Sequence, residues 1–260
     1  MRLDQASQDR GEFLLAIGEG RMTVDRTHGK GFVKIPDELL TSRSLDDLIQ
    51  KTYGDDIATA DYANRAIFTP KNDDVTMINR KMKDLFPGEV HHYKSADTAE
   101  VDSLSDHVWP TEFLNTLAPN GIPPHELALK VGMPIVLLRN LSPAQGLCNG
   151  TRMKIDQLQS RVLEVTILNG THAGKKAFIP RVTLRLTQST LPFTLCRLQF
   201  PIRVAFAMTI NKSQGQTIEH VGVFLPKPVF SHGQLYVALS RCPTFPNLHV
   251  YIEHGPVSTH

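Results

Sequence analysis

The sequence has too few cysteines, too widely spaced, for disulfide or zinc chemistry. Its three cysteines, Cys148, Cys196 and Cys242, lie roughly fifty positions apart and form no CxxC pair. This pattern is typical of buried or incidental thiols in a reducing compartment rather than of a disulfide framework or a zinc site. The eleven histidines show no HExxH spacing, so we expect no bound metal.

Long hydrophobic runs are also missing. No apolar stretch approaches the roughly 18 residues that a membrane-spanning helix needs. Residues 1–12 mix basic with acidic side chains, which fits neither a secretory signal nor an acid-poor mitochondrial presequence. We therefore expect no membrane association and a nuclear or otherwise intracellular protein.

The chain has little net charge and few large aromatic side chains. Its formal net charge is +2 and Trp109 is its single tryptophan. A nearly neutral protein has no overall field that would attract a polyanion. Any contact with nucleic acid must therefore be made by a local set of residues.

The first region, residues 1–95, alternates strand and helix signals. RAIFTP at 65–70 is a short apolar run that ends in proline, which predicts a buried strand. Asn72 or Asp73 then caps a predicted helix that ends before Pro87-Gly88. The apolar positions of this helix fall three and four residues apart, at Val75, Ile78, Met82 and Leu85. Strand followed by amphipathic helix is the repeating unit of a parallel α/β sheet.

The second region, about 110–186, has the texture of a small antiparallel barrel. Asn149-Gly150 and Asn169-Gly170 are strong hairpin signals, because both residue types tolerate positive φ. Short apolar runs between these turns predict strands at 135–138, 151–155, 162–168, 177–179 and 182–186.

The α/β texture returns after Leu191. The sequence predicts a strand, or a strand leading into a helix, at 203–210, and further strands at 221–225 and 248–252. Ser231, with Gln234 three residues later, has the spacing of a capping box and predicts the start of a helix.

Two segments carry side chains suited to chemistry. In AFAMTINKSQGQT, residues 205–217, a strand leads into a polar loop where Gly215 permits close approach of a phosphate and Lys212 can hold a nucleic-acid backbone. A plain polar turn between two sheet elements explains the same residues. In VFSHGQLYVALSRC, residues 229–242, Arg241 ends a helix. There it either complements the helix dipole or reaches a γ-phosphate as an arginine finger, which is worth about 10³–10⁵ in rate.

Taken together, these segments resemble motifs V and VI of superfamily-one helicases, in the form found in the Pif family and its Helitron relatives. AIFTPKNDDVTMIN, LKVGMPIVLLRNLSPAQGLCNGTR and FIPRVTL also resemble that family, so the resemblance covers nearly all of the chain from about residue 65. It implies an α/β fold: a RecA-like second motor domain (2A) with an inserted Src-homology-3-like antiparallel β-barrel (2B). The implied boundaries are 1–110 and 187–260 for domain 2A and 111–186 for domain 2B.

The resemblance also assigns roles to individual residues. Arg241 resembles the motif VI arginine finger, and Arg2, in an MRL remnant of motif IV, resembles a second finger. The resemblance places nucleotide-sensing positions at Gln214, Gly215 and Gln216. Its single-stranded-DNA contacts fall at Thr209, Asn211, Lys212, Ser213, Thr69 and Asn72. Asn211 departs from the usual histidine of the family, and Asn72 is equally well explained as a helix cap.

One expected motif is absent. No GxxxxGK[ST] occurs in the sequence, and GTHAGKK at 170–176 comes nearest to it. The family resemblance implies an ATP-dependent 5′-to-3′ DNA helicase of DNA repair, recombination, telomere maintenance or Helitron transposition, using ATP and Mg²⁺. We expect this chain to need a partner RecA-like domain with Walker A and B, and to bind neither cofactor alone. A non-catalytic, transposon-derived fragment that binds single-stranded DNA, or an inert fragment, are the alternatives.

Overall fold

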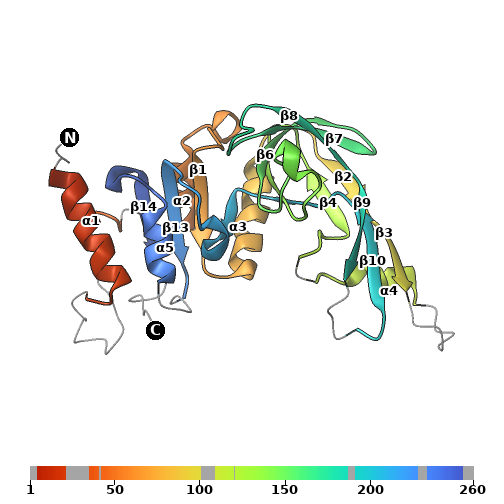
Figure 1. The fold of residues 1–260 in the computed structure, drawn as a ribbon, viewed down its shortest axis with the longest axis horizontal. Helices are drawn as coiled ribbons and strands as arrows, with labels where there is room; N and C mark the ends of the chain where they lie inside the picture. Colours follow the sequence, from red (N-terminus) through yellow and green to blue (C-terminus); the bar gives the residue numbers. More distant parts are fainter. Residues whose placement is uncertain are drawn as a thin grey trace. The chain divides into compact units, whose positions relative to one another are not determined.

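The computed structural model describes residues 5–21, 35–40, 42–100, 109–119, 121–186, 191–227 and 233–253 (Figure 1). The chain forms two compact units, each with its own sheets. Unit 1 comprises residues 1–85 and 206–260, and unit 2 comprises residues 86–205. Within the described ranges, every helix is too short or too polar to span a membrane.

Unit 1 is built on one parallel sheet. Its strand order is β12 (Ala207–Thr209), β1 (Arg65–Thr69), β13 (His220–Leu225) and β14 (Leu248–Ile252). Strands of a parallel sheet are covered on both faces, which explains why their sequences are continuous apolar runs. The strands predicted at 65–70, 221–225 and 248–252 are confirmed.

Helices cover both faces of this sheet. On one face, α2 (Leu45–Tyr53) packs against β13 so closely that a Cβ at Gly222 would collide with Oγ1 of Thr52. On the other face, α1 (Gln5–Gly18) and α5 (Gln234–Ser240) share a hydrophobic core with alternate residues of the strands. The main members of this core are Leu14, Ile17, Ala66, Phe68, Val221, Val223, Leu235, Leu239, Leu248 and Val250.

Helix α3 (Asn72–Leu85) fixes the edge strand β12. The helix packs against β12 and β1, and its Asn79 side chain bonds both backbone groups of Ala207. Asn79 Nδ2 donates to the Ala207 carbonyl at 3.1 Å, and the Ala207 N–H donates to Asn79 Oδ1 at 2.9 Å. The strand that leads into the 209–216 loop is therefore held at its backbone.

Unit 2 is antiparallel. A five-stranded sheet has the order β11 (Ile202–Val204), β5 (Pro134–Leu137), β6 (Arg152–Leu158), β7 (Val162–Ile167) and β8 (Lys176–Pro180). A three-stranded sheet has the order β3 (Ala96–Glu100), β10 (Thr194–Gln199) and β9 (Val182–Leu186). The remaining elements are the pair β2 (His91–Lys94) and β4 (Glu126–Leu129), helix α4 (Thr111–Thr116), and the 3-10 turn η2 (Pro143–Gln145). The predicted α/β fold with an antiparallel insertion is confirmed.

A buried ion pair joins the elements of unit 2. Arg197 on β10 donates from Nη2 to Asp97 Oδ2 on β3 at 2.6 Å, and both side chains are fully buried. The same guanidinium donates to the carbonyls of Pro123 and Leu114 at 3.0 and 3.1 Å. Residues 86–110 and 187–205, which the sequence assigns to the larger domain, lie in unit 2 because β3 and β9 pair with β10. The domain limits predicted from the sequence, 1–110 and 187–260 for domain 2A and 111–186 for domain 2B, stay a prediction.

Two predicted helix starts are wrong. Helix α3 includes Asn72 as its first residue rather than as its cap, with Asp73 and Asp74 in the first turn, where acidic side chains complement the helix dipole. Helix α5 begins at Gln234 after Gly233, which has φ 78° and makes no side-chain cap. Ser231 lies outside the described residues.

The remaining elements of unit 1 are the 3-10 turns η1 (Ile57–Thr59), η3 (Ile210–Ser213) and η4 (Phe245–Asn247).

Candidate functional site

The candidate site begins where two neighbouring strands of unit 1 end. Thr69 closes β1 and Thr209 closes β12, and the register of the pair places the two threonines opposite each other. Both are buried, with 0% and 9% of their surface exposed. Ligands of open parallel sheets bind beyond the carboxyl ends of the strands, so this edge is where a ligand is expected.

A carboxyl group lies beside Thr69. The Thr69 hydroxyl donates to Asp74 Oδ2 at 3.5 Å, and Asp74 belongs to the first turn of α3. Burial raises the pKa of the Asp74 carboxyl above its usual value, while the charges of Lys71 and Lys227 oppose that shift. These two lysines bring positive charge to the same edge of the sheet.

The 3-10 turn η3 decides which side chains of the polar loop reach solvent. Asn211 and Lys212 are exposed, whereas Ser213 is fully buried and its hydroxyl donates to the Ile210 carbonyl at 2.7 Å. Lys212 and Asn211 are therefore accessible to a nucleic-acid backbone. The Ser213 hydroxyl supports the turn, and its predicted DNA contact stays a prediction.

The second half of the loop is closed by Gln216. Its Nε2 donates to the Lys212 carbonyl at 3.2 Å, and its backbone N–H donates to the Ser213 carbonyl at 3.0 Å. Gly215 between them has φ 80°, a left-handed conformation that glycine adopts without strain. Gln214 is exposed. The loop therefore has a defined shape that depends on glycine at position 215.

The guanidinium of Arg241 lies against this loop. Its Nη1 donates to the Gln216 carbonyl at 3.4 Å, and its Nε donates to the Val237 carbonyl at 3.1 Å. Its Nη2 donates to the Ser240 hydroxyl at 2.9 Å, and the Ile218 N–H donates to the Arg241 carbonyl at 3.0 Å. The side chain is half-buried, not enclosed in the core. The structure thus brings the end of α5 and the 212–216 loop together.

Two further residues were predicted for the site, Arg2 and Asn72. Arg2 lies outside the described residues. Asn72 is exposed at the start of α3, two residues beyond Pro70, and makes no side-chain hydrogen bond among the described residues. Its predicted DNA contact stays a prediction.

Sequence reasoning missed Asn79. Its amide holds β12 and so positions the loop that follows. The signal was available, because Asn79 lies between Ile78 and Met82 on the buried side of α3, where a polar side chain needs hydrogen-bond partners.

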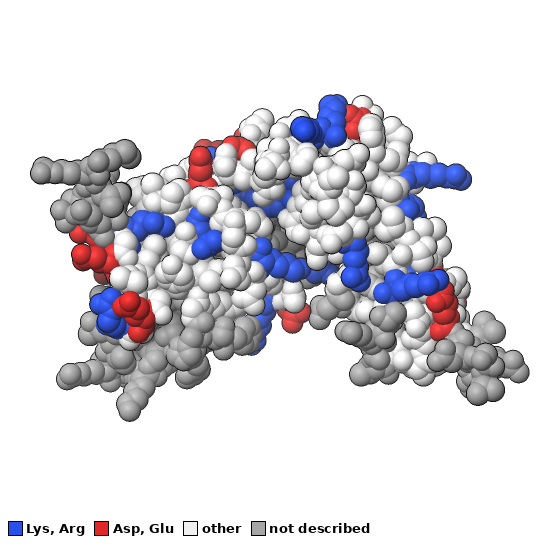
Figure 2. All heavy atoms as spheres, viewed as in Figure 1, with Lys and Arg blue, Asp and Glu red and all other residues white. Residues whose placement is uncertain are grey.

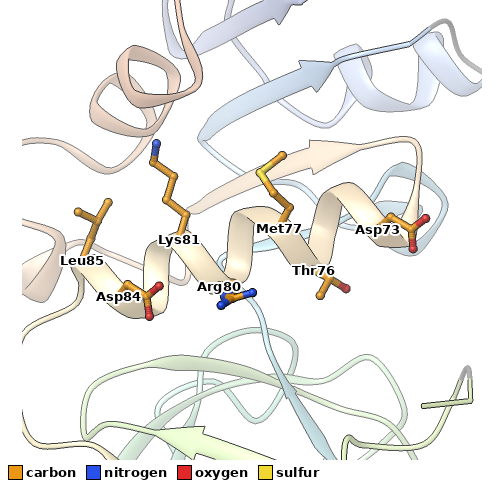
Figure 3. A pocket seen from close by; sticks show the side chains of 7 residues that line it. All are labelled: Asp73, Thr76, Met77, Arg80, Lys81, Asp84 and Leu85. Atoms are coloured by element: carbon orange, nitrogen blue, oxygen red, sulfur yellow. The ribbon is translucent and has the colours of Figure 1, made fainter. Parts of the chain in front are cut away.

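A hollow of about 600 Å³ lies along the outward side of α3 (Figure 3). All the side chains that line it come from this one helix: Asp73, Thr76, Met77, Arg80, Lys81, Asp84 and Leu85. Sites for small molecules bring polar groups from several elements to one point. The lining of this hollow does not, so we do not place the site there.

Comparisons with known proteins agree with this geometry. The family model described as "DNA helicase Pif1, 2B domain" matches residues 112–158. The human "ATP-dependent DNA helicase PIF1" is 34% identical over 190 residues, which are 72% of this chain and 27% of the human protein. This chain belongs to the Pif1 family of DNA helicases. It spans about a quarter of the length of the human, rat and mouse PIF1 helicases.

Solved Pif1 structures have the same fold. Pif1 helicase from Candida albicans superimposes with a TM-score of 0.63 at 22% identity, over 97% of this chain and 56% of that one. Pif1 from Bacteroides in complex with ADP-AlF3 and single-stranded DNA gives a TM-score of 0.60 at 23% identity, over 97% and 50% of the two chains. The parallel sheet and the antiparallel insertion are therefore those of a Pif1 helicase.

Proposed function

We propose that this chain is the part of an ATP-dependent 5′-to-3′ DNA helicase that grips single-stranded DNA and responds to bound nucleotide. The hydrogen bond from Arg241 to the Gln216 carbonyl carries the proposal. It joins the predicted arginine finger to the loop that presents Asn211 and Lys212. The name of the human relative, and the DNA and nucleotide analogue in the Bacteroides structure, support the choice of ligands.

The loop transmits movement in this proposal. Arg241 has a limited set of donors and uses Nη1, Nη2 and Nε within the chain. In this proposal a γ-phosphate draws the guanidinium away from the loop, so that the Nη1 bond to the Gln216 carbonyl is exchanged for a bond to a charged acceptor, which is stronger. Releasing the Gln216 carbonyl loosens the loop at the end that Gln216 closes onto Lys212. The DNA-facing side chains then shift along the strand.

The residues present fit one part of a nucleotide site. Arg241 and the backbone around Gly215 suit a γ-phosphate. Across the described ranges, no group of three or more His, Cys, Asp or Glu side chains could hold a metal ion. We therefore propose that Mg²⁺ and the β-phosphate are held by a partner RecA-like domain with Walker A and B motifs.

The test joins this chain to a P-loop RecA-like domain of a Pif1-family helicase. R241A should lower the DNA-stimulated ATPase rate by about 10³–10⁵-fold, the usual contribution of an arginine finger, and leave DNA binding nearly unchanged. R43A is the control for loss of an arginine from unit 1, because Arg43 is exposed and directly precedes Ser44, the cap of α2. The proposal is wrong if R241A hydrolyses ATP at the parental rate, or if the chain alone hydrolyses ATP when DNA is added.

A further inference from the structure

Charge is distributed very unevenly within unit 2. Residues 127–205 contain eleven lysines and arginines but only two acidic residues, Asp156 and Glu164. Residues 86–126 contain one lysine and seven acidic residues. The net charge of the chain is close to zero, but residues 127–205 are strongly basic. This segment contains all strands of the five-stranded sheet as well as β9 and β10. Blue side chains also predominate over red ones around these strands on the face seen in Figure 2.

Some of these basic side chains are neutralised inside the unit. Arg197 pairs with Asp97, Arg185 pairs with Glu100, and Lys176 pairs with Glu164. Four others are exposed and make no ion pair among the described residues: Arg139, Lys154, Arg161 and Lys175. Of these four, Lys154 lies on β6 and Lys175 directly precedes β8, so the five-stranded sheet has exposed positive charge without an ion pair among the described residues.

The strand register aligns part of this charge. Lys154 on β6 lies opposite Thr166 on β7, which lies opposite Lys176 on β8. Side chains in one such row point to the same side of a sheet, with neighbouring strands about 4.8 Å apart. The two lysines thus project from the same side, about 10 Å from each other. Lys175 precedes this row directly.

An exposed phenylalanine lies on the same side. Phe178 is two residues beyond Lys176 on β8 and is 60% exposed, the largest exposed fraction of any apolar side chain in the described residues. β8 is an edge strand of the sheet, so the ring is open along that edge. The packing of the sheet does not bury this ring. Sites for single-stranded nucleic acid combine basic side chains with exposed aromatic rings on which bases stack.

Glu164 neutralises Lys176, so the positive charge of this face that has no ion pair among the described residues is that of Lys154 and Lys175. Only 13% of the Glu164 side chain is exposed, and it is occupied by Lys176. Asp156 accepts a hydrogen bond from the Thr166 hydroxyl at 2.5 Å. The register also places Arg152 and Arg203 on this side of the sheet, each opposite Val136. Arg152 is fully buried and Arg203 is half-buried, so neither belongs to the exposed surface around Lys154.

We propose that this surface, here called the β6–β8 face (Lys154, Thr166, Lys175, Lys176 and Phe178), is a second binding site for single-stranded nucleic acid. The lysines bind the phosphate backbone and a base stacks on Phe178. The site is separate from the loop at 209–216. The choice of single-stranded nucleic acid as the ligand of this site rests on the proposed function.

The test measures binding of a fluorescently labelled oligothymidylate to the full chain, by anisotropy over a range of salt concentrations. K154Q should make the slope of log K against log salt shallower by about 0.7, because one phosphate contact is lost from a single strand. F178A should weaken binding by about 5- to 150-fold, the range for the loss of one stacked base. F178W should restore it.

Two control variants are matched in charge and exposure. R161Q removes an exposed charge at the far end of the same hairpin, and V131A shortens an apolar side chain that is 53% exposed. Neither should alter the affinity or the slope. The inference is overturned if K154Q and F178A bind like the parent, or if R161Q has the same effect as K154Q. If those variants bind like the parent while K212Q loses affinity, the proposed function stands and only the second site fails. If the parent chain binds no oligonucleotide, both fail.

Discussion

The two units use buried polar groups in different ways. In unit 1, three buried polar side chains, Thr69, Thr209 and Ser213, lie at the edge of the parallel sheet from which the loop after β12 begins. In unit 2, the buried Arg197–Asp97 pair lies inside the unit and ties α4, β3 and β10 together. The difference teaches that buried polar groups at the edge of the parallel sheet mark a candidate site, whereas the buried pair of unit 2, like Asn79 in unit 1, is an internal support.

The largest expected effect tests the internal support. R197A leaves the Asp97 carboxylate buried without its guanidinium, which should lower the free energy of unfolding of unit 2 by about 3–5 kcal/mol. Trp109 is the single tryptophan and lies in unit 2, so its fluorescence during urea unfolding reports on this unit.

An exposed ion pair gives the control. Arg185 on β9 and Glu100 on β3 pair with each other across the strand between them, β10, and 63% and 52% of their side chains are exposed. R185A should therefore lower the free energy of unfolding by at most about 1 kcal/mol. Equal losses in the two variants would show that burial of the Arg197 pair does not support the unit.

A smaller effect is expected in unit 1. N79A leaves the N–H and C=O of Ala207 without the Asn79 amide, which should cost about 1–3 kcal/mol and weaken DNA binding by the adjoining loop. T76A is the control, because Thr76 is exposed on the same helix and should change stability by less than about 0.5 kcal/mol. Urea unfolding followed by circular dichroism, together with oligonucleotide binding, measures both effects. If N79A loses stability but binds DNA normally, β12 does not position the loop.

The smallest effect concerns pH. Burial lowers the pKa of His220 and of His249 below the ordinary value of 6.5, and nearby positive charges act in the same direction. The folded chain therefore favours the neutral rings. The stability that this preference provides is complete above about pH 6.5 and is lost as the pH falls from there toward the lowered pKa values. The charged neighbours are Arg65, Lys51, Glu219, Asp61 and Asp47.

Replacing one of these rings should make unfolding less dependent on pH. H249Q should show a smaller loss of melting temperature than the parent between pH 7.5 and pH 5.5. A steeper pH dependence in H249Q would contradict the assigned direction.

The sequence predicted the elements whose pattern is local. β1, β13 and β14 are continuous apolar runs, and β6 and β7 are separated by turn residues, so propensity and spacing were enough to find them. β3 could not be found in this way. Its residues, ADTAE, have no apolar pattern, and the strand exists because Asp97 meets Arg197 across the register with β10. That contact joins positions a hundred residues apart.

The candidate site was predictable only in part. The resemblance to helicase motifs located Arg241 and the loop, but not the atoms that join them. The bond to Gln216 involves a backbone carbonyl, which no side-chain pattern reveals. Ser213 shows the opposite limit: its residue type suggested a DNA contact, and the tight 3-10 turn placed its hydroxyl inside.

The most direct test of the central claim is the coupling between nucleotide and DNA. In this chain joined to a P-loop RecA-like domain, single-stranded DNA affinity would be measured by anisotropy with and without ADP-AlF3. The parent should change its DNA affinity when the nucleotide analogue binds, and R241A should bind DNA with one affinity in both conditions. If R241A keeps the parent's full response, the Arg241–Gln216 contact does not link the two sites.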